Sequence, residues 1–251
     1  MYLIFDLDDT LLTTDKVITR YTKSVLRTCQ RRGHLIVINS ARPFVKIKEV
    51  CKDIEVDYII ANGGSEIYNG ETLIYSNYIN NKLLNTILSD IRQDPRLISF
   101  SVQSDFLYTQ NMDFVDKNYF ARYFDFEKKF TDNASKLIIN SNDPRFAYDL
   151  GRRYDLHVTS YLNGDWYRLA NTTKAEGCLA LYKILGDLNP LSVAFGDDHG
   201  DLEMLQGATY GIAMKNSTAE VLASIQTVSE FSNDEDGCAS HLEKLILEGV
   251  L

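Results

Sequence analysis

The segment FDLDDTLL, residues 5–12, places three carboxylates within four positions directly after an apolar run. Asp6 and Asp8 are two residues apart, so in an extended chain their side chains project to the same face. Carboxylates this close repel one another unless they share a cation or act together on a substrate. Paired carboxylates can serve as nucleophile, general acid/base or metal ligand. A calcium loop is excluded because its sixth and twelfth positions would be Leu11 and Val17, whereas a plain polar turn stays open.

A second acidic segment, FGDDHGDLEML at residues 195–205, also follows an apolar run. Its Asp197, Asp198 and Asp201 would by themselves suit the amino-terminal cap of a helix. If both apolar runs are parallel strands of one sheet, the two acidic groups meet at its carboxyl edge, where open α/β sheets bind ligands. Carboxylate oxygens are the donors that hard cations prefer, so we expect a Mg²⁺ site there.

Two further segments offer groups that could bind a phosphate. In INSARPF, residues 38–44, Ser40 follows an apolar run and precedes an expected helix with Pro43 near its first turn. Ser40 suits a helix N-cap, and the same place offers a hydroxyl and backbone amides to an anion. In NTTKAEG, residues 171–177, the spacing of threonine and glutamate predicts a capping box and a helix that begins at about Lys174.

Lys174 breaks a local rule, because a cation in the first turn of a helix opposes the helix dipole. Such exceptions tend to occur at functional sites. A solvated surface lysine is the alternative. Together with the acidic motifs, we expect Lys174 to face the carboxylates and a bound phosphate.

Alternating strand and helix patterns surround these motifs. Before the middle of the chain we expect strands at 2–6, 34–39 and 57–62 and helices at 20–32 and 44–53. After it we expect helices at 173–185, 201–206, 217–224 and 239–248 and strands at 191–195 and 210–214. Short apolar strands separated by helices indicate parallel pairing with both faces covered. The predicted fold is therefore α/β, with a doubly wound, Rossmann-like parallel sheet as its core.

The middle of the chain differs in character, since aromatic residues and alternating strands are concentrated there. Asn69-Gly70 predicts a hairpin just before it. Within it we expect helices at 80–93, 113–124 and 143–154, a strand pair around 97–109, and strands at 136–140, 156–162 and 165–170. We therefore predict a core domain of residues 1–78 and 166–251, interrupted by an inserted α+β domain of residues 79–165.

The chain has 251 residues, of which 45% are apolar and 24% charged, and a net charge of −9. The negative charge argues against binding to nucleic acid or to an anionic membrane, and no apolar run approaches the length of a membrane span. The four cysteines lie far apart and form no C-x-x-C pair, which disfavours a zinc site or a disulfide framework. MYLIF is too short for a signal peptide and lacks its basic flank, so we expect a cytoplasmic protein.

The four motifs, in this order, resemble the haloacid dehalogenase-like (HAD) superfamily of aspartate-nucleophile phosphatases. D-x-D-x-T after an amino-terminal strand together with a late G-D-x-x-x-D is a specific combination, although each motif alone is weak. The likeness extends over essentially the whole chain and includes GIAMKNSTAEVLASIQTVSEFSNDEDGCASHL, residues 211–242. The nearest match is the Cof-type subfamily, which has a large α/β cap inserted after the third core strand.

The resemblance implies catalytic and phosphate-binding roles. Asp6 would be the nucleophile and Asp8 the general acid/base. Thr10 would support the loop and the phosphate site, while Ser40 and the amide of Ala41 would hold the phosphoryl group.

The resemblance also implies a set of charged groups around the phosphate. Lys174 would neutralise charge on the phosphoryl group and on Asp6. Mg²⁺ would be held by Asp6, the backbone carbonyl of Asp8 and Asp197, with Asp201 in support.

The chain departs from the subfamily at one position of the last motif. Gly200, preceded by His199, stands where the subfamily usually has an asparagine that approaches the phosphate. Either His199 or Asn171 takes over that contact, or phosphate binding is weakened.

The expected function is a Mg²⁺-dependent phosphatase that hydrolyses a small phosphorylated metabolite, foremost a sugar phosphate, through an aspartyl phosphate. The alternatives are a phosphomutase or phosphotransferase of the same superfamily and, from another class, a non-catalytic module that binds a phosphorylated metabolite. The presence of both Asp6 and Asp8 argues against the module, because binding alone needs no acid/base. Candidate contacts to the rest of the substrate are Arg42, Asn62, Asn171 and Trp166.

Overall fold

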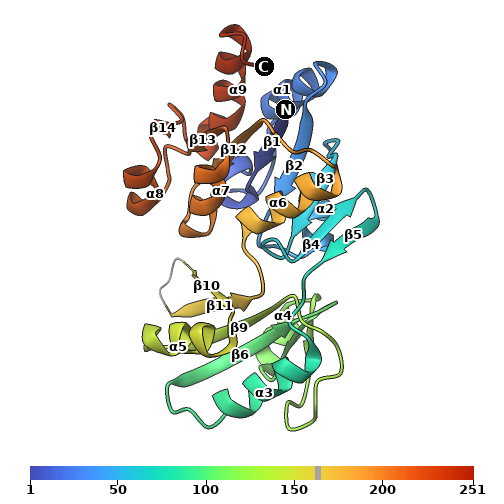
Figure 1. Ribbon diagram of the computed structural model, residues 1–251, viewed down its shortest axis with the longest axis vertical. Helices are drawn as coiled ribbons and strands as arrows, with labels where there is room; N and C mark the ends of the chain where they lie inside the picture. The colour runs from blue at the N-terminus through green and yellow to red at the C-terminus, as the bar shows by residue number, and fades with distance from the viewer. Residues whose placement is uncertain (162–164) are drawn as a thin grey trace. The chain divides into compact units, whose positions relative to one another are not determined.

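The computed structural model describes residues 1–161 and 165–251, which form two compact units. The first unit comprises Met1–Ser76 and Thr173–Leu251, and the second comprises Asn77–Thr172 (Figure 1). Each unit contains one β-sheet. None of the helices within the described ranges combines the length and apolar character that crossing a bilayer requires.

The sheet of the first unit has eight strands and is mainly parallel. Its order is β14-β13-β12-β1-β2-β3-β4-β5, with antiparallel pairing only at β3–β4 and β4–β5 among the described strands. The strands are β1 (Tyr2–Phe5), β2 (Leu35–Asn39), β3 (Tyr58–Ala61), β4 (Glu66–Asn69), β5 (Thr72–Ser76), β12 (Ser192–Gly196), β13 (Tyr210–Ala213) and β14 (Thr227–Val228). The predicted doubly wound core is confirmed, and β14 is a short strand that the sequence pattern did not predict.

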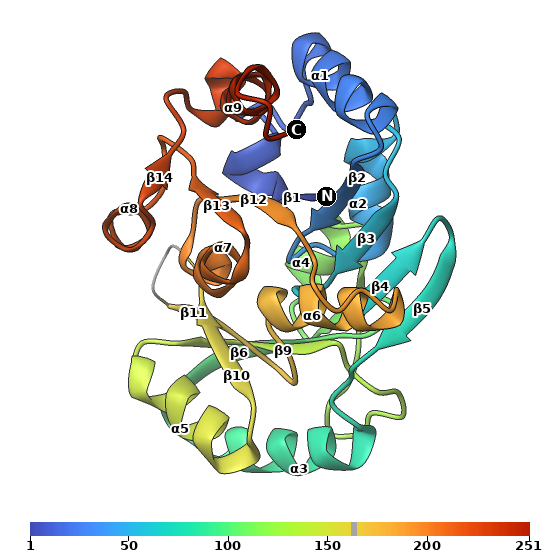
Figure 2. The ribbon, with the colours of Figure 1, turned by 45° about the horizontal axis from the view of Figure 1, so that its top comes forward.

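Helices cover both faces of this sheet (Figure 2). Leu3 and Phe5 pack with α1, α2 and α9, whereas Tyr2 and Ile4 pack with α6, α7 and α8. These helices are α1 (Arg20–Arg31), α2 (Phe44–Cys51), α6 (Lys174–Ile184), α7 (Leu202–Gly207), α8 (Ala219–Ser224) and α9 (Gly237–Leu247). Because successive side chains of β1 point to opposite covered faces, the strand is buried along its whole length.

Two local sequence signals in the first unit are confirmed. β4 and β5 form the predicted antiparallel hairpin. Asn69 pairs with Thr72, so Gly70 and Glu71 make the turn, and Gly70 has a positive φ of 57°. α6 begins at Lys174, where Thr173 and Glu176 form the predicted capping box.

The second unit has a six-stranded mixed sheet in the order β10-β11-β9-β6-β7-β8. The strands are β6 (Leu97–Gln103), β7 (Leu107–Thr109), β8 (Ala121–Tyr123), β9 (Lys136–Ser141), β10 (His157–Ser160) and β11 (Trp166–Ala170). The helices are α3 (Asn81–Ile91), α4 (Met112–Lys117) and α5 (Pro144–Tyr154). One apolar core joins α3 and α5 to the sheet. A mainly parallel core sheet and a second mixed sheet thus match the predicted fold class.

The predicted helix 113–124 is wrong in its second half. α4 ends at Lys117, Asn118 adopts an extended conformation, and β8 follows and pairs with β7 in parallel. The segment after Asn118 is rich in aromatic residues, which favour strands, and buried Phe120 and Ala121 tie it to the unit.

The boundary between the units differs from the predicted one at its second end. β11 pairs with β9 and β10, so residues 166–172 belong to the second unit and not to the first. The alternation of residues 165–170 predicted the strand, but the sequence did not show which sheet it joins. Residue 162, the end of the predicted strand 156–162, lies outside the described residues.

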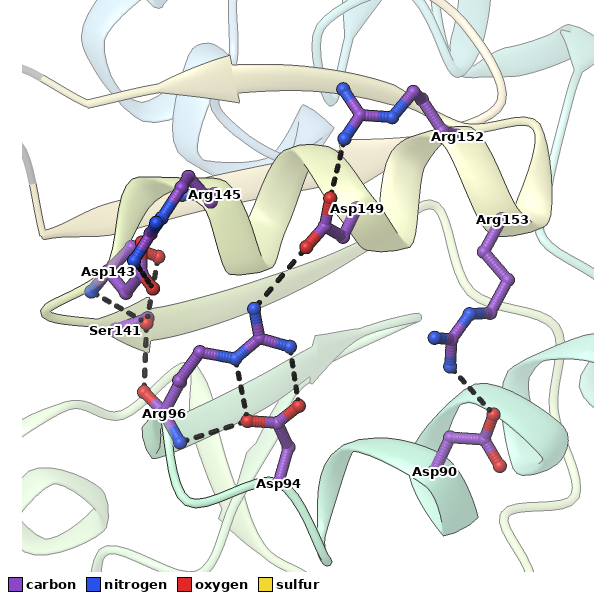
Figure 3. A network of polar contacts seen from close by, with 9 residues as sticks. All are labelled: Asp90, Asp94, Arg96, Ser141, Asp143, Arg145, Asp149, Arg152 and Arg153. Carbon is purple, nitrogen blue, oxygen red and sulfur yellow. Dashed lines mark hydrogen bonds and ion pairs between the residues drawn. The ribbon is translucent and has the colours of Figure 1, made fainter.

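Polar contacts fasten α5 to its neighbours in the second unit (Figure 3). Arg96 binds Asp94 through both nitrogens of its guanidinium edge, at 2.9 and 2.7 Å, and reaches Asp149 of α5 at 3.3 Å. At the other end of α5, Arg153 lies 3.4 Å from Asp90 of α3. Because the side chains of these ion pairs are half-buried or exposed, we assign the pairs a role in aligning α5 more than in stability.

Candidate active site

Three buried aspartates meet at the carboxyl edge of the core sheet. Asp6 follows β1 and Asp197 follows β12, and the register pairs Phe5 with Phe195, so the two strands end side by side. Asp201 lies in the turn that follows Asp197. One carboxylate oxygen from each of the three aspartates lies within 4.8 Å of the other two. Parallel pairing therefore brings the two acidic segments of the sequence together.

Asp201 is folded back against the end of β12 and is fully buried. Its Oδ2 accepts backbone N–H groups from Asp197 at 3.1 Å and from Asp198 at 3.3 Å. A Cβ atom on Gly196 would lie 2.5 Å from the Cβ of Asp201, so this close approach requires glycine. Asp198 caps the same turn by accepting the N–H of Gly200 at 2.8 Å.

Lys174 supplies the positive charge of the cluster from the first turn of α6. Its Nζ donates to Asp6 and to Asp201, at 2.6 Å each, and its side chain is buried. The fully buried Asn39, at the end of β2, donates from Nδ2 to the carbonyl oxygen of Lys174 at 2.9 Å. The start of α6 is thereby tied to the edge of the sheet that carries Asp6.

The loop after β1 is held by residues from the far end of the chain. The Thr10 hydroxyl donates to Asp197 at 2.6 Å. Asn216 donates to the carbonyl of Asp9 at 2.7 Å, and Asn233 donates to the carbonyl of Leu12 at 3.0 Å. These bonds fix both the backbone of the acidic loop and the orientation of Asp197.

The cluster has more negative than positive charge. Burial and the neighbouring carboxylates raise the pKa of Asp6 well above its ordinary value, against the attraction of Lys174. Burial also raises the pKa of Asp197 to about 7, although Thr10 donates to it. Burial disfavours the charged form of Lys174, but Asp201 and Asp6 outweigh this effect and raise its pKa. An excess of close carboxylates with only oxygen donors fits a hard divalent cation, so these residues could hold a metal ion.

The carboxylate of Asp8 lies outside the group of three and is bound by two cations. Arg42 donates to it from Nε at 2.7 Å and from Nη2 at 2.6 Å, and Lys16 Nζ lies 2.9 Å from its Oδ1. Partial burial raises the pKa of Asp8, but the bonds from Arg42 and Lys16 outweigh burial and lower it. Arg42, a predicted substrate contact, thus engages Asp8.

Ser40 directly follows β2 but does not cap α2, which corrects the expected N-cap. Pro43 precedes the first residue of α2, while the Ser40 hydroxyl accepts the N–H of Arg42 at 3.2 Å in a tight turn. Asn62 donates its N–H to the carbonyl of Arg42 at 2.9 Å from a left-handed conformation, with φ of 53°. Ser40, Ala41 and Asn62 therefore belong to the loops at the carboxyl ends of β2 and β3.

The remaining predicted residues lie away from the three aspartates or in the second unit. His199 is exposed and faces Glu220, with 3.1 Å between Nδ1 and Oε2. Asn171 donates to the carbonyl of Tyr78 at 2.7 Å within the second unit. Trp166, the first residue of β11, is half-buried in the same unit. The roles of these residues in substrate binding stay predictions.

The sequence matches a family model described as haloacid dehalogenase-like hydrolase over residues 3–242. This span contains all the motifs described above. The chain belongs to this family. The resemblance to the HAD superfamily and to its Cof-type members is thereby confirmed, and the protein is a HAD-like hydrolase.

Relatives of this HAD-like hydrolase match it along nearly their whole length. "Putative phosphatase BU028/BU029" of Buchnera aphidicola subsp. Acyrthosiphon pisum is 27% identical over 260 residues, which cover 97% of this chain and 95% of the relative. A haloacid dehalogenase-like hydrolase structure from B. subtilis aligns with a TM-score of 0.81 at 22% identity, covering 98% and 100% of the two chains. The structure of the HAD subclass IIB sugar phosphatase BT4131 aligns with a TM-score of 0.79 at 19% identity, covering 100% and 99%.

Sequence reasoning missed several residues that contact the site. Asn39 carried a signal, since it is the lone amide at the end of the apolar strand LIVIN. Lys16, Asn216 and Asn233 carried none, because their contacts depend on turns and on pairings across most of the chain.

Proposed function

We propose that this HAD-like hydrolase is a Mg²⁺-dependent phosphatase that acts on a small phosphorylated metabolite through an aspartyl phosphate. The observation that carries the proposal is the pairing of Asp6 with Lys174 beside two further buried aspartates, at the end of the sheet where α/β folds bind ligands. A carboxylate next to an ammonium group suits attack on a phosphate ester, because phosphoryl transfer depends mainly on positioning and charge neutralisation.

Asp6 is the proposed nucleophile and Asp8 the proposed acid/base. A carboxylate oxygen of Asp6 bonds to phosphorus while the bond from phosphorus to the leaving oxygen breaks, and Asp8 gives its proton to that oxygen. Asp8 then takes a proton from a water molecule whose oxygen attacks the phosphorus of the aspartyl phosphate. This second step releases phosphate and restores the Asp6 carboxylate. Lys174 holds Asp6 in place and stabilises negative charge on the phosphoryl oxygens.

The residues proposed to hold Mg²⁺ are Asp6, the backbone carbonyl of Asp8 and Asp197, with Asp201 in support. The bound ion would supply positive charge to the phosphoryl group. Thr10 orients Asp197, since its hydroxyl donates to that carboxylate. Ser40 and the Ala41 amide are the proposed contacts to the phosphoryl oxygens.

A sugar phosphate is the foremost substrate class. Its support is the similarity in fold to the subclass IIB sugar phosphatase BT4131, at 19% identity. Arg42, Asn62, Asn171 and Trp166 are the residues that we propose to test for contacts to the rest of the substrate. A panel of phosphorylated sugars and other metabolites, compared by kcat/KM, checks this assignment.

The test of the chemistry is phosphate release from p-nitrophenyl phosphate with and without Mg²⁺. We expect activity that requires Mg²⁺, is abolished in Asp6→Asn and is strongly reduced in Asp8→Asn, with both variants folded. An amide is nearly isosteric with the carboxylate but is a very poor nucleophile. Retained Mg²⁺-dependent turnover by purified Asp6→Asn would overturn the mechanism.

The same assay, repeated with an added sugar as phosphoryl acceptor, separates a phosphatase from the alternative functions. A binding module releases no phosphate from any ester. A phosphomutase or phosphotransferase forms the aspartyl phosphate but transfers the phosphoryl group to an added sugar in preference to water, which the ratio of phosphorylated sugar to free phosphate measures.

A further inference from the structure

Lys16 adopts a backbone conformation that lysine rarely adopts. Its φ is 60°, in the left-handed region that favours glycine or asparagine. The turn that contains it is closed by bonds from Lys16 N to the Thr13 carbonyl at 2.8 Å and from Thr13 N to the Val17 carbonyl at 3.0 Å. The conformation is therefore built into the turn.

The same turn is fastened to the carboxyl-terminal part of the first unit. Thr14 donates to Asp234 both from its backbone N–H and from its hydroxyl, at 2.7 Å each. These two bonds fix where the turn lies relative to the acidic loop, and with it the direction of the Lys16 side chain.

The ammonium group of Lys16 lies between two carboxylates of the acidic loop. Its Nζ is 2.9 Å from Asp8 Oδ1 and 3.4 Å from Asp9 Oδ1. Asp9 is also left-handed, with φ of 58°. Arg42 binds Asp8 through two nitrogens, so the two cations hold the Asp8 carboxylate together.

Stability does not account for this arrangement. The side chains of Lys16 and Asp8 are 43% and 41% exposed, and ion pairs this exposed contribute little to folding. That small gain does not outweigh two non-glycine residues in left-handed conformations. Strain of this kind persists where a particular side chain is needed for function.

We propose that Lys16 is a positioning residue that fixes the orientation of the Asp8 carboxyl group for proton transfer. The inference rests on the proposed function, in which Asp8 protonates the leaving oxygen. Arg42 sets the plane of the carboxylate through its paired nitrogens, and Lys16 restrains Oδ1. Lys16 also favours the charged form of Asp8, so its loss by itself would leave more of the proton-donating form. A loss of rate that grows with the need for acid assistance therefore reports lost orientation of the carboxyl group.

The experiment compares kcat/KM for phenyl phosphate and p-nitrophenyl phosphate, which are similar in size but differ in leaving group. kcat/KM reports the steps up to formation of the aspartyl phosphate, and nitrophenolate leaves with little help from an acid. Lys16→Asn keeps a residue that tolerates the left-handed conformation but lacks the cation, and Lys16→Arg restores a cation. Lys23→Asn, at a half-buried lysine that pairs with the exposed Asp53, is the matched control.

We expect Lys16→Asn to lower kcat/KM for phenyl phosphate about tenfold and that for p-nitrophenyl phosphate less than about threefold, with partial recovery in Lys16→Arg. Lys23→Asn should change neither value. Equal losses on both esters, or no loss, would overturn the inference, because a merely structural defect scales both reactions alike.

The Asp8→Asn variant shows whether a negative result overturns only the role of Lys16 or also the acid/base role of Asp8. If Asp8→Asn penalises phenyl phosphate selectively and Lys16→Asn does not, Lys16 has no positioning role and the proposed function stands. If Asp8→Asn itself shows no selective penalty, the acid/base assignment fails and the inference fails with it.

Discussion

At the scale of single residues, the site depends on one buried lysine among several carboxylates. Lys174 donates to both Asp6 and Asp201, and all three side chains are buried. Taking these groups out of water is costly, and their mutual attraction compensates only while every member is present. The lysine therefore holds the buried carboxylates of the folded site together.

Replacing this lysine with methionine should destabilise the metal-free protein. Lys174→Met leaves two buried carboxylates without their partner, so the free energy of unfolding at neutral pH should fall by about 3 kcal/mol. Mg²⁺ should recover part of the loss because it restores positive charge. Urea denaturation with and without Mg²⁺ measures both effects. Lys23→Met is the control, with a loss below about 1 kcal/mol, since its partner Asp53 is exposed to solvent. A Lys174→Met protein as stable as wild type would contradict the prediction.

Mg²⁺ binding should strengthen as the pH rises through neutrality. Burial raises the pKa of Asp197 to about 7 and also raises the pKa of Asp6, so the cation must displace protons below that pH. Each released proton contributes about tenfold in affinity per pH unit, and the gain levels off above the pKa. Calorimetric titration below and above pH 7, in buffers of different ionisation enthalpy, measures affinity and proton release. An affinity independent of pH would contradict the raised pKa.

In the metal-free protein, a rise in pH has the opposite effect: it lowers the stability of the folded state, whereas it strengthens Mg²⁺ binding. The folded state keeps protons that the unfolded chain releases above about 3.8, so the contribution of Asp197 to stability falls as the pH rises from about 4 to about 7. Thr10→Val should enlarge this effect, because removal of the Thr10 hydrogen bond to Asp197 takes away an interaction that lowers its pKa.

The sequence predicted those site residues that lie on a regular strand or helix or directly after one. Asp6 and Asp197 follow strands whose apolar pattern implied parallel neighbours, and the capping box fixed the start of the helix that carries Lys174. The burial of Lys174 was not predictable, since its local sequence suits a surface position equally well. Lys16 was beyond reach because its contact with Asp8 follows from a turn conformation that lysine does not favour.

At the scale of elements, the geometry of the site depends on how α6 is joined to β2. Asn39 is fully buried, and its Nδ2 donates to the Lys174 carbonyl at 2.9 Å. Its Oδ1 has no hydrogen-bond partner within the described residues. Burying an unpaired oxygen lowers the stability of the fold, and packing alone does not explain why an asparagine is retained there. The tie fixes where the first turn of α6 begins.

Asn39→Ala should therefore impair catalysis beyond its effect on stability. Loss of the buried bond should lower the free energy of unfolding by about 1–3 kcal/mol. A small displacement of Lys174 should lower kcat about tenfold or more. Ser192→Ala, at the buried opposite end of β12, is the control and should lose stability while keeping kcat. If the two variants lose stability equally and both keep kcat, Asn39 has only a packing role.

The periodicity of apolar residues predicted the strands and helices whose faces stay buried or exposed along their length. The central strands β1, β2, β3 and β12 are buried along most or all of their length, and each was predicted to within one residue at either end. The two-residue β14 at the sheet edge was not predicted. The failure at 118–124 came from a segment whose helix ends at an asparagine and whose aromatic residues then pair with β7. The aromatic residues favour a strand, but the pairing that forms it depends on tertiary contacts that the sequence pattern does not show.

At the scale of the whole molecule, the two units have separate hydrophobic cores. The core of the second unit is formed by residues between Ile79 and Leu169, and the two cores of the first unit contain none of these residues. The two ends of the second unit are also joined, because Asn171 donates to the carbonyl of Tyr78. A core of its own and adjacent ends are the features that let a domain fold alone.

Residues 77–172 expressed alone should therefore fold and unfold cooperatively, without phosphatase activity. The fragment has about 100 residues, a usual size for an independent domain, and it keeps every strand of the mixed sheet together with α3, α4 and α5. Circular dichroism and urea denaturation measure its folding. Phe126→Ala removes a fully buried ring and should lower the free energy of unfolding by about 3–5 kcal/mol in the fragment. A fragment that binds hydrophobic dyes, unfolds gradually and does not respond to Phe126→Ala would show that the second unit needs the first in order to fold.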